Sequence, residues 1–559
     1  MDKDFTYKDG PNVSPKSLGW SDFARSEHDN SRYSLLNVYS NFNKAFGQHE
    51  IGATIGFEQQ LESAQYFTGE RDGLVSNSAP SVGVAAGENK TLTDSRFTWA
   101  TRSGFYRVNY SFGKRYIIEA NGRYDGTSRF QKNHRFGFFP SFSGAWILSN
   151  EKFFEPIKNI MNLAKLRMSY GWLGNQNVGY YEYVSNMTFY ECNYLLNGRK
   201  PIGVGSPNLI SDDLTWEKVN TINLGFDFGL FSNRLTVSTD IYRRYTKDML
   251  TTGPTLPGVL GVASPRQNAA DLRTQGWELS IGWRDRFTLA SKPFNYSVKF
   301  NLSDSSAEII KFNNATGTLN DYYKGYKIGT IWGLTTEGFF IDEDDIKQHA
   351  NQWEVTSYPG DRPLAPGDLK YKDLNNDGYV NKGKWTVDDH GDYSIIGNTT
   401  PRYCYGADIN ATWNGFDFRV ILQGVGKKDW YPNVFNFFGI YRAPWSNVYT
   451  NNLDHWTADN PNAYFPRLKS YTAETAGDMS IAQTRYLQNA AYMRIKNITV
   501  GYTLPKSLTR KLHLEDVRLY FSGDNVAEFT KLSHNVDPEG LDLTHPMQRV
   551  FSFGLNLSF

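Results

Sequence analysis

The segment whose residue types and spacing come closest to a chemical site is Asp-Leu-Asn-Asn-Asp-Gly-Tyr-Val-Asn at positions 373–381. Oxygen-bearing side chains stand at its positions 1, 3, 5 and 9, and Gly378 stands at position 6. A calcium-binding loop of the EF-hand type has this spacing, with the glycine at its sharp turn. The spacing predicts a structural Ca²⁺ site whose ligands are Asp373, Asn375, Asp377, the Tyr379 carbonyl and Asn381.

The closure of this loop departs from the calcium-binding pattern. Position 12 should supply a bidentate carboxylate, but it is Lys384. Asp388 and Asp389 follow four and five residues later and would have to fold back to replace it. The alternative is a turn rich in Asp and Asn that holds its own backbone without a metal. The sequence leaves both interpretations open.

Motifs for catalysis do not accompany this loop. The nine histidines show neither HExxH nor another paired ligand spacing, and there is no GxSxG elbow, Walker loop or dinucleotide fingerprint. The two cysteines, Cys192 and Cys404, are far apart, which argues against a disulfide scaffold or a cysteine metal site. We therefore expect no enzymatic activity and no required cofactor.

Composition limits the class of protein and its partners. The 559 residues include 59 Lys and Arg against 58 Asp and Glu, so the net charge of +1 gives no field for nucleic acid. Aromatic residues make up 15% of the chain, yet its mean hydropathy is −0.53. No stretch approaches the roughly 20 apolar residues that a membrane-spanning helix needs. Strands escape this test because only one face of each must be apolar.

Alternation with a period of two dominates the chain. In 551–559 every second residue is Phe or Leu, and Ser, Gly and Asn stand between them. A hairpin over 222–244 repeats the pattern, and its Asp227 and Asp240 share the face opposite the apolar one. Acidic residues on that face fit a polar lumen better than a dry core. The pattern predicts an all-β, antiparallel transmembrane β-barrel; the alternative is a soluble extracellular all-β array.

The predicted strands are joined by short turns at one end and long loops at the other, as in outer-membrane barrels. We expect about 15 strands after an irregular segment 1–31, within a barrel region 32–559: 32–46, 49–60, 97–112, 115–128, 134–148, 163–174, 217–230, 234–249, 273–287, 293–307, 402–413, 415–425, 488–504, 515–523 and 547–559. The long loops, which this pattern predicts to be extracellular, are 61–96, 175–216, 250–272, 308–401, 426–487 and 524–546. Their Tyr, Trp, Asn, Asp and Gly residues suit either contact with polar cargo or simple packing.

Several segments, in order, resemble the C-terminal barrel of the SusC/RagA family of TonB-dependent outer-membrane transporters. They include Gly-Arg-Tyr-Asp-Gly-Thr-Ser-Arg-Phe at 122–130, Arg-Phe-Gly-Phe-Phe-Pro-Ser-Phe-Ser-Gly-Ala-Trp at 135–146, and the stretches 166–176, 223–250, 276–279, 366–371, 456–461, 491–497 and 537–540. Each is weak alone, but together they cover nearly the whole chain.

This resemblance implies a plugged barrel of about 22 strands in the outer membrane of a Bacteroidetes-type bacterium. It implies import of large nutrients, glycans or oligopeptides. The implied partners are a SusD-like surface lipoprotein, the TonB complex acting through the plug, and outer-membrane lipid.

The sequence departs from the family pattern at its N-terminal side, where we find no signal peptide, TonB box or plug, and about seven strands fewer than a 22-stranded barrel needs. We therefore expect the chain to be the C-terminal barrel portion of a longer parent. The alternative function is that of a non-transporting extracellular all-β protein for carbohydrate binding or adhesion.

Overall fold

The fold of this chain, taken from a computed structural model, is built from β-strands. The structure describes residues 22–76, 81–356, 364–432, 435–441, 448–469, 479–532, 536–541 and 547–559. The fifteen long strands are β1 (Phe23–Phe46), β2 (His49–Asp72), β3 (Lys90–Phe112), β4 (Tyr116–Thr127), β5 (Phe136–Ile147), β6 (Met161–Asn175), β9 (Glu217–Leu230), β10 (Leu235–Thr252), β11 (Arg266–Leu289), β12 (Lys292–Phe312), β17 (Arg402–Trp413), β18 (Phe416–Lys427), β21 (Tyr492–Thr503), β22 (Asp516–Thr530) and β23 (Val550–Ser558).

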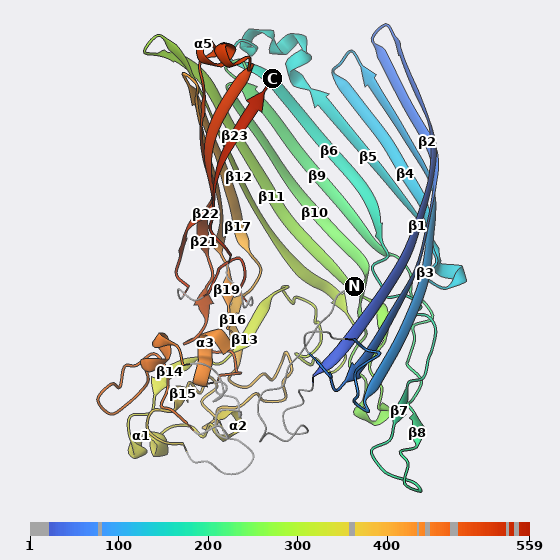
Figure 1. Cartoon of the computed structure of the whole chain (residues 1–559), viewed down its shortest axis with the longest axis vertical. Coiled ribbons are helices and arrows are strands. Elements are labelled where there is room, and N and C mark those ends of the chain that lie inside the picture. The colour runs from blue at the N-terminus through green and yellow to red at the C-terminus, as the bar shows by residue number, and fades with distance from the viewer. Residues whose placement is uncertain are drawn as a thin grey trace.

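These strands form one antiparallel sheet in which each strand pairs with the next long strand along the chain. The sheet curves as the wall of a barrel does (Figure 1). β1 and β23 are its two edges, and within the described residues they do not pair with each other. The predicted all-β antiparallel barrel fold is confirmed.

The two ends of the sheet differ as the sequence predicts. Tight turns lie at the end that carries the C-terminus, and the long connections gather at the other end (Figure 1). The turn between β17 and β18 shows why the residues at this end form tight turns. Asn414 and Gly415 have φ values of +47° and +88°, the left-handed pair that a two-residue hairpin requires and that Asn-Gly adopts most readily.

The outer face of the sheet carries apolar side chains that remain exposed among the described residues. On β23, Phe551, Phe553, Leu555 and Leu557 are exposed, with Phe553 at 85% of its full accessibility. Similar residues are exposed on other strands, among them Ile118 of β4 and Ile241 of β10. A soluble array would bury such side chains, so this face suits contact with lipid.

The opposite face is polar and ion-paired. Arg167 of β6 reaches across the neighbouring strands and binds Asp227 of β9 at 2.8 Å and Asp240 of β10 at 3.0 Å. Ser238 donates a further hydrogen bond to Asp227, and Asn223 donates one to Asp240. The prediction that Asp227 and Asp240 share the non-apolar face is confirmed, and one arginine satisfies both carboxylates.

The strands run farther toward the long loops than predicted. β1 begins at Phe23, so the segment predicted as irregular, 1–31, is too long; its residues 1–21 lie outside the described residues. β2 and β3 stay paired as far as Arg71 and Lys90, which shortens the predicted loop 61–96. In these extensions polar residues predominate on both faces, and an ion pair of 2.9 Å joins Arg25 to Glu70. Alternation therefore disappears although the strand continues.

Other predicted loop limits change in the same way. β10 and β11 extend into 250–272, β12 extends into 308–401, and β22 extends into 524–546. The remaining strands are short and lie in the loops: β7 (Phe189–Glu191), β8 (Ile202–Val204), β13 (Thr330–Gly333), β14 (Thr336–Phe339), β15 (Leu369–Tyr371), β16 (Ser394–Asn398), β19 (Asp429–Trp430) and β20 (Gln488–Asn489).

Helices are few and short. They are α1 (Glu343–Gln348), α2 (Trp353–Thr356), α3 (Phe435–Phe438), α5 (Lys506–Thr509) and the 3₁₀ turns η1 (Lys132–His134), η2 (Leu148–Asn150), η3 (Lys152–Ile157), η4 (Gly258–Leu260), η5 (Gly439–Tyr441), η6 (Thr450–Leu453) and η7 (Arg510–Leu512). None of the described helices has the length and apolar character needed to cross a bilayer.

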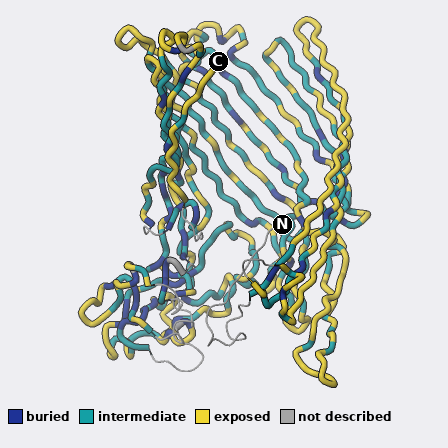
Figure 2. Tube along the Cα trace, viewed as in Figure 1, coloured by how far each residue is buried: buried dark blue, intermediate teal, exposed yellow. Residues whose placement is uncertain are grey.

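The largest hydrophobic core lies in the loops and not in the sheet. Buried residues concentrate where α1, α2, α3 and β13–β16 gather (Figure 2). We call this region the loop lobe. Its fully buried side chains are Leu334, Leu369, Tyr371, Val380, Phe438, Phe465, Tyr486 and Ala490.

A lipid-facing position on β23 tests the orientation of the sheet. Leu555→Arg should lower the free energy of unfolding in lipid vesicles by roughly 2–4 kcal/mol if the residue lies near the bilayer midplane. Ser552→Arg adds the same charge to the opposite face of the same strand and should cost much less. Urea unfolding of the two variants measures the difference, and equal costs would contradict the assignment of the faces.

Candidate functional site

The loop lobe is assembled from three separate connections. They are the segments between β12 and β17, between β18 and β21, and between β22 and β23. Within the connection between β18 and β21, the ring centroid of Tyr486 lies 5.5 Å from that of Phe438 and 5.4 Å from that of Tyr464. Its hydroxyl donates to the Tyr464 carbonyl oxygen at 3.1 Å. For these aromatic residues the packing interpretation holds.

The interior of the lobe is dry. Burial raises the pKa of Tyr486 well above its ordinary value, and burial also raises the pKa of Tyr393 to about 12. At the rim the opposite occurs, because a hydrogen bond from Lys370 lowers the pKa of Asp345. The lobe is therefore a folded unit with an apolar interior and a charged rim, not a set of solvated loops.

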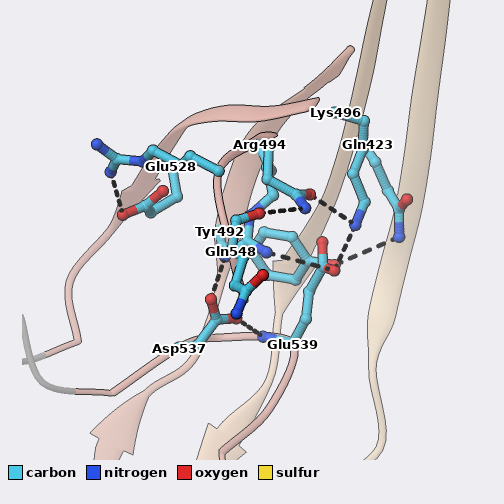
Figure 3. A network of polar contacts seen from close by, with 10 residues as sticks. Gln423, Tyr492, Arg494, Lys496, Glu528, Asp537, Glu539 and Gln548 are labelled. Atoms are coloured by element: carbon cyan, nitrogen blue, oxygen red, sulfur yellow. Dashed lines mark hydrogen bonds and ion pairs between the residues drawn. The ribbon is translucent and has the colours of Figure 1, made fainter. Parts of the chain in front are cut away.

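A buried arginine joins the lobe to the barrel wall (Figure 3). Arg494 of β21 is 1% exposed, and its Nη2 lies 2.7 Å from Asp537 Oδ2. Glu539 lies 3.5 Å from Arg494 Nη1 and 2.6 Å from Lys496 Nζ. Two cations of one strand thus hold two carboxylates of the turn 537–540, which closes with a hydrogen bond from Gly540 to Asp537.

The sequence marks both partners of this contact as parts of family-like stretches, but it does not indicate that they bind each other. Arg494 and Asp537 fall in the stretches 491–497 and 537–540, which resemble family motifs. Nothing in either stretch says that they meet. The alternation of Tyr492, Arg494 and Lys496 is the only local signal, because three polar residues on one face of a strand need partners.

A crevice lies where the loops after β10 and β12 meet. Its volume is about 550 Å³, and Phe312, Tyr322 and Tyr326 contribute aromatic rings to its lining. Asp321, at its edge, accepts hydrogen bonds from the backbone nitrogen and the hydroxyl of Thr255 at 3.0 and 2.8 Å. Aromatic rings beside amide and carboxylate groups can hold a polar molecule that has one apolar face.

The acidic segment 373–381 is folded into consecutive turns. Asp373 accepts hydrogen bonds from the backbone nitrogens of Asn376 and Gly378 at 2.6 and 2.9 Å. Asn375, Asp377 and Asn381 each accept one from the residue two positions later. Gly378 has φ +85°, as the predicted turn requires. The structure therefore brings the predicted ligands together in one short loop.

A carboxylate that the sequence reasoning missed closes this loop. Asp392 is fully buried and accepts hydrogen bonds from the backbone nitrogens of Leu374 and Asn381, at 2.7 and 2.8 Å. Of the two candidates named for that role, Asp389 instead lies 3.8 Å from Lys384. No local spacing rule points to Asp392, because it acts through backbone nitrogens.

The hydrogen bonds of 373–381 satisfy the turn without a metal. Among the described residues, no three acidic, His or Cys side chains are grouped so as to hold a metal ion. Asn375, Asn381 and a carbonyl would have to supply much of the coordination. Calcium binding at this loop stays a prediction.

Comparisons with known proteins place these features in context. Residues 2–526 match the family described as TonB-dependent receptor-like, β-barrel. Among curated relatives, TonB-dependent receptor P3 of Formosa agariphila is 29% identical over 96% of this chain and 53% of its own length. TonB-dependent receptor SusC of Bacteroides thetaiotaomicron is 27% identical over 98% of this chain and 52% of its own length.

Solved structures agree in fold. A chain of the RagAB peptide transporter superimposes with a TM-score of 0.75 at 24% identity, covering 96% of this chain and 56% of that one. The chain thus spans about half the length of the relatives it matches.

Calcium can be tested directly at the acidic loop. The double variant Asp373→Ala and Asp377→Ala should lose calcium-dependent protection of 373–381 from proteolysis, with the unaltered protein saturating at about 10⁻⁴–10⁻³ M Ca²⁺. Asp344→Ala, which removes an exposed carboxylate of α1 outside the loop, serves as the control. Proteolysis of the unaltered protein that does not respond to calcium would leave the segment a turn.

The buried ion pair predicts a local stability difference. Asp537→Asn leaves the Arg494 cation with a weaker partner, so opening of 536–541 should become easier by about 3 kcal/mol. The matched control is Glu528→Gln, which removes an exposed pair with Arg549 and should change opening by at most about 1 kcal/mol. Amide hydrogen exchange measures both, and similar effects would argue against the role of burial.

Proposed function

Because this chain belongs to the TonB-dependent receptor-like β-barrel family, we propose that it forms the wall and surface loops of an outer-membrane importer of large polar nutrients. The protein is located in the outer membrane, as its family is. Its role is to bind cargo and let it pass, without altering it chemically.

The observation that carries this proposal is the contrast between the two ends of the sheet. The end with long connections bears the loop lobe. The lobe has its own buried core, and the ion pair between Arg494 and Asp537 attaches it to the barrel wall. Between the lobe and the tight turns, the inner face of the sheet carries ion-paired polar side chains such as Arg167 and Asp227. A cargo held at the lobe would therefore meet a hydrated, polar path and no apolar barrier.

We further propose that the cargo is a glycan or an oligopeptide. One of the similar structures is that of the RagAB peptide transporter, and the relative SusC is a TonB-dependent receptor. The crevice beside Tyr322 and Tyr326 has the mixture of aromatic and polar groups that either cargo would use. It is the first place at which to test cargo binding.

The proposed partners are a SusD-like surface lipoprotein over the loop lobe and the TonB complex, which would supply energy from the inner membrane. The lobe offers a lipoprotein a preformed surface, because its shape is fixed by its own core. Lipid surrounds the outer face.

The experiment is carried out with the tagged protein in its own cell. A surface lipoprotein should co-purify in mild detergent, and uptake of fluorescent oligosaccharides or oligopeptides should require TonB. Tyr322→Ala with Tyr326→Ala should reduce cargo binding by about tenfold, the loss expected when two aromatic contacts are removed.

Tyr194→Ala, an exposed loop tyrosine away from the crevice, is the control. Uptake that persists without TonB would contradict the import proposal. If the double variant binds and imports cargo normally, only the proposal that the crevice binds cargo is contradicted.

A further inference from the structure

The outer face of β9–β12 changes from apolar to polar over three successive rows of side chains. The registers of these strands align Leu224, Ile241, Trp277 and Asp304 in one row, which we call the turn-side row. One pair farther toward the long loops, Ile222, Arg243, Gln275 and Ser306 form the loop-side row. Beyond it, Asn220, Tyr245, Arg273 and Glu308 form a wholly polar row.

The rows on the other side are apolar. Next to the turn-side row lie Phe226, Thr239, Leu279 and Leu302, followed by Phe228, Val237, Ile281 and Phe300. With the strand rise and tilt usual for such barrels, Arg243 lies roughly 21 Å along the barrel axis from the tight turn at Leu235, close to the height of an apolar band about 25 Å tall. The two mixed rows thus mark the boundary between hydrocarbon and headgroups.

A crevice of about 570 Å³ is hollowed at this boundary. Its lining includes Leu224, Ile241 and Trp277 toward the tight turns, and Arg243, Gln275 and Ser306 toward the long loops. We call it the outer-face crevice. One half of the crevice offers apolar contact, which suits an acyl chain. The other half offers hydrogen-bond donors, which suit a polar headgroup.

The charges of the crevice are unbalanced. Arg402 and Asp304 neutralise each other in a two-point contact, with Nη2 and Oδ2 2.6 Å apart. Arg273 and Glu308 form a second pair at 2.9 Å. Arg243 lies between these pairs and forms no ion pair or side-chain hydrogen bond with any residue in the described ranges.

Further cations adjoin the crevice on the loop side. A smaller cavity of about 200 Å³ shares Ser306 and Arg402 with it and is also lined by Lys327 and Lys427. Both lysines are exposed, and Lys427 pairs in register with Arg402. Among the described residues neither lysine forms an ion pair, so both add positive charge beside Arg243, which a phosphate group would satisfy.

We propose that the outer-face crevice binds one phosphorylated lipid of the outer leaflet. Its phosphate lies against Arg243, within reach of Lys427, and one acyl chain lies over Leu224, Ile241 and Trp277. A soluble phosphate could satisfy the cations but would leave the apolar half uncovered. The combination of both halves at the membrane boundary selects a lipid.

The test uses the full chain, purified from its own membrane, stripped of lipid by detergent exchange, and incubated with equimolar phosphatidylglycerol and phosphatidylcholine of identical acyl chains. Native mass spectrometry then counts the lipids retained. The unaltered protein should retain phosphatidylglycerol preferentially. Arg243→Gln should lower this retention about fivefold, and adding Lys427→Gln should lower it further.

The matched control is Arg244→Gln, which removes the same charge from the next residue, on the opposite face of β10. It should retain lipid as the unaltered protein does. Folding of each variant is checked by heat-modifiable migration on gels, and if Arg243→Gln misfolds, Lys427→Gln alone carries the test.

Three results would overturn the proposal. They are equal retention of the two lipids, an equal loss in Arg244→Gln, and displacement of phosphatidylglycerol by excess inorganic phosphate. The last would show a site for soluble anions that needs no acyl chain.

Discussion

The absence of water in the hydrocarbon region is the constraint on which this structure depends. Every backbone N–H and C=O at that depth must be paired within the protein, because an unpaired group there costs several kcal/mol. Long antiparallel strands joined by tight turns meet this demand between the two edge strands β1 and β23. Once the strands are in place, lipid on one side and water on the other decide which residue types each face carries.

This constraint also explains what could be predicted from the sequence. Alternation of residue types is enforced where lipid contacts the sheet, and each of the fifteen long strands overlaps a strand that alternation predicted. Outside the membrane both faces are wet, so the paired ends at Arg25 and Glu70 leave no periodic signal. A polar strand and a polar loop then look alike in the sequence, although their backbones differ.

The candidate sites show a second limit, which is that long-range contacts have no local pattern. The turns of 373–381 could be predicted because Asp, Asn and Gly act on their own neighbours. Asp392 could not, since it contacts only backbone nitrogens. The contact of Arg494 with Asp537 could not be predicted either, nor could the packing of three connections into one core, because both depend on the completed fold.

The loop lobe has a consequence for the order in which the molecule assembles. Its core combines residues as far apart in the chain as Leu334 and Leu532, and the wall strands β17, β18, β21 and β22 lie between them in the sequence. Closing such distant contacts early would cost much chain entropy. The lobe should therefore be among the last parts to fold, after the strands beneath it have found their register, so that the outermost surface of the protein matures only once its wall is built.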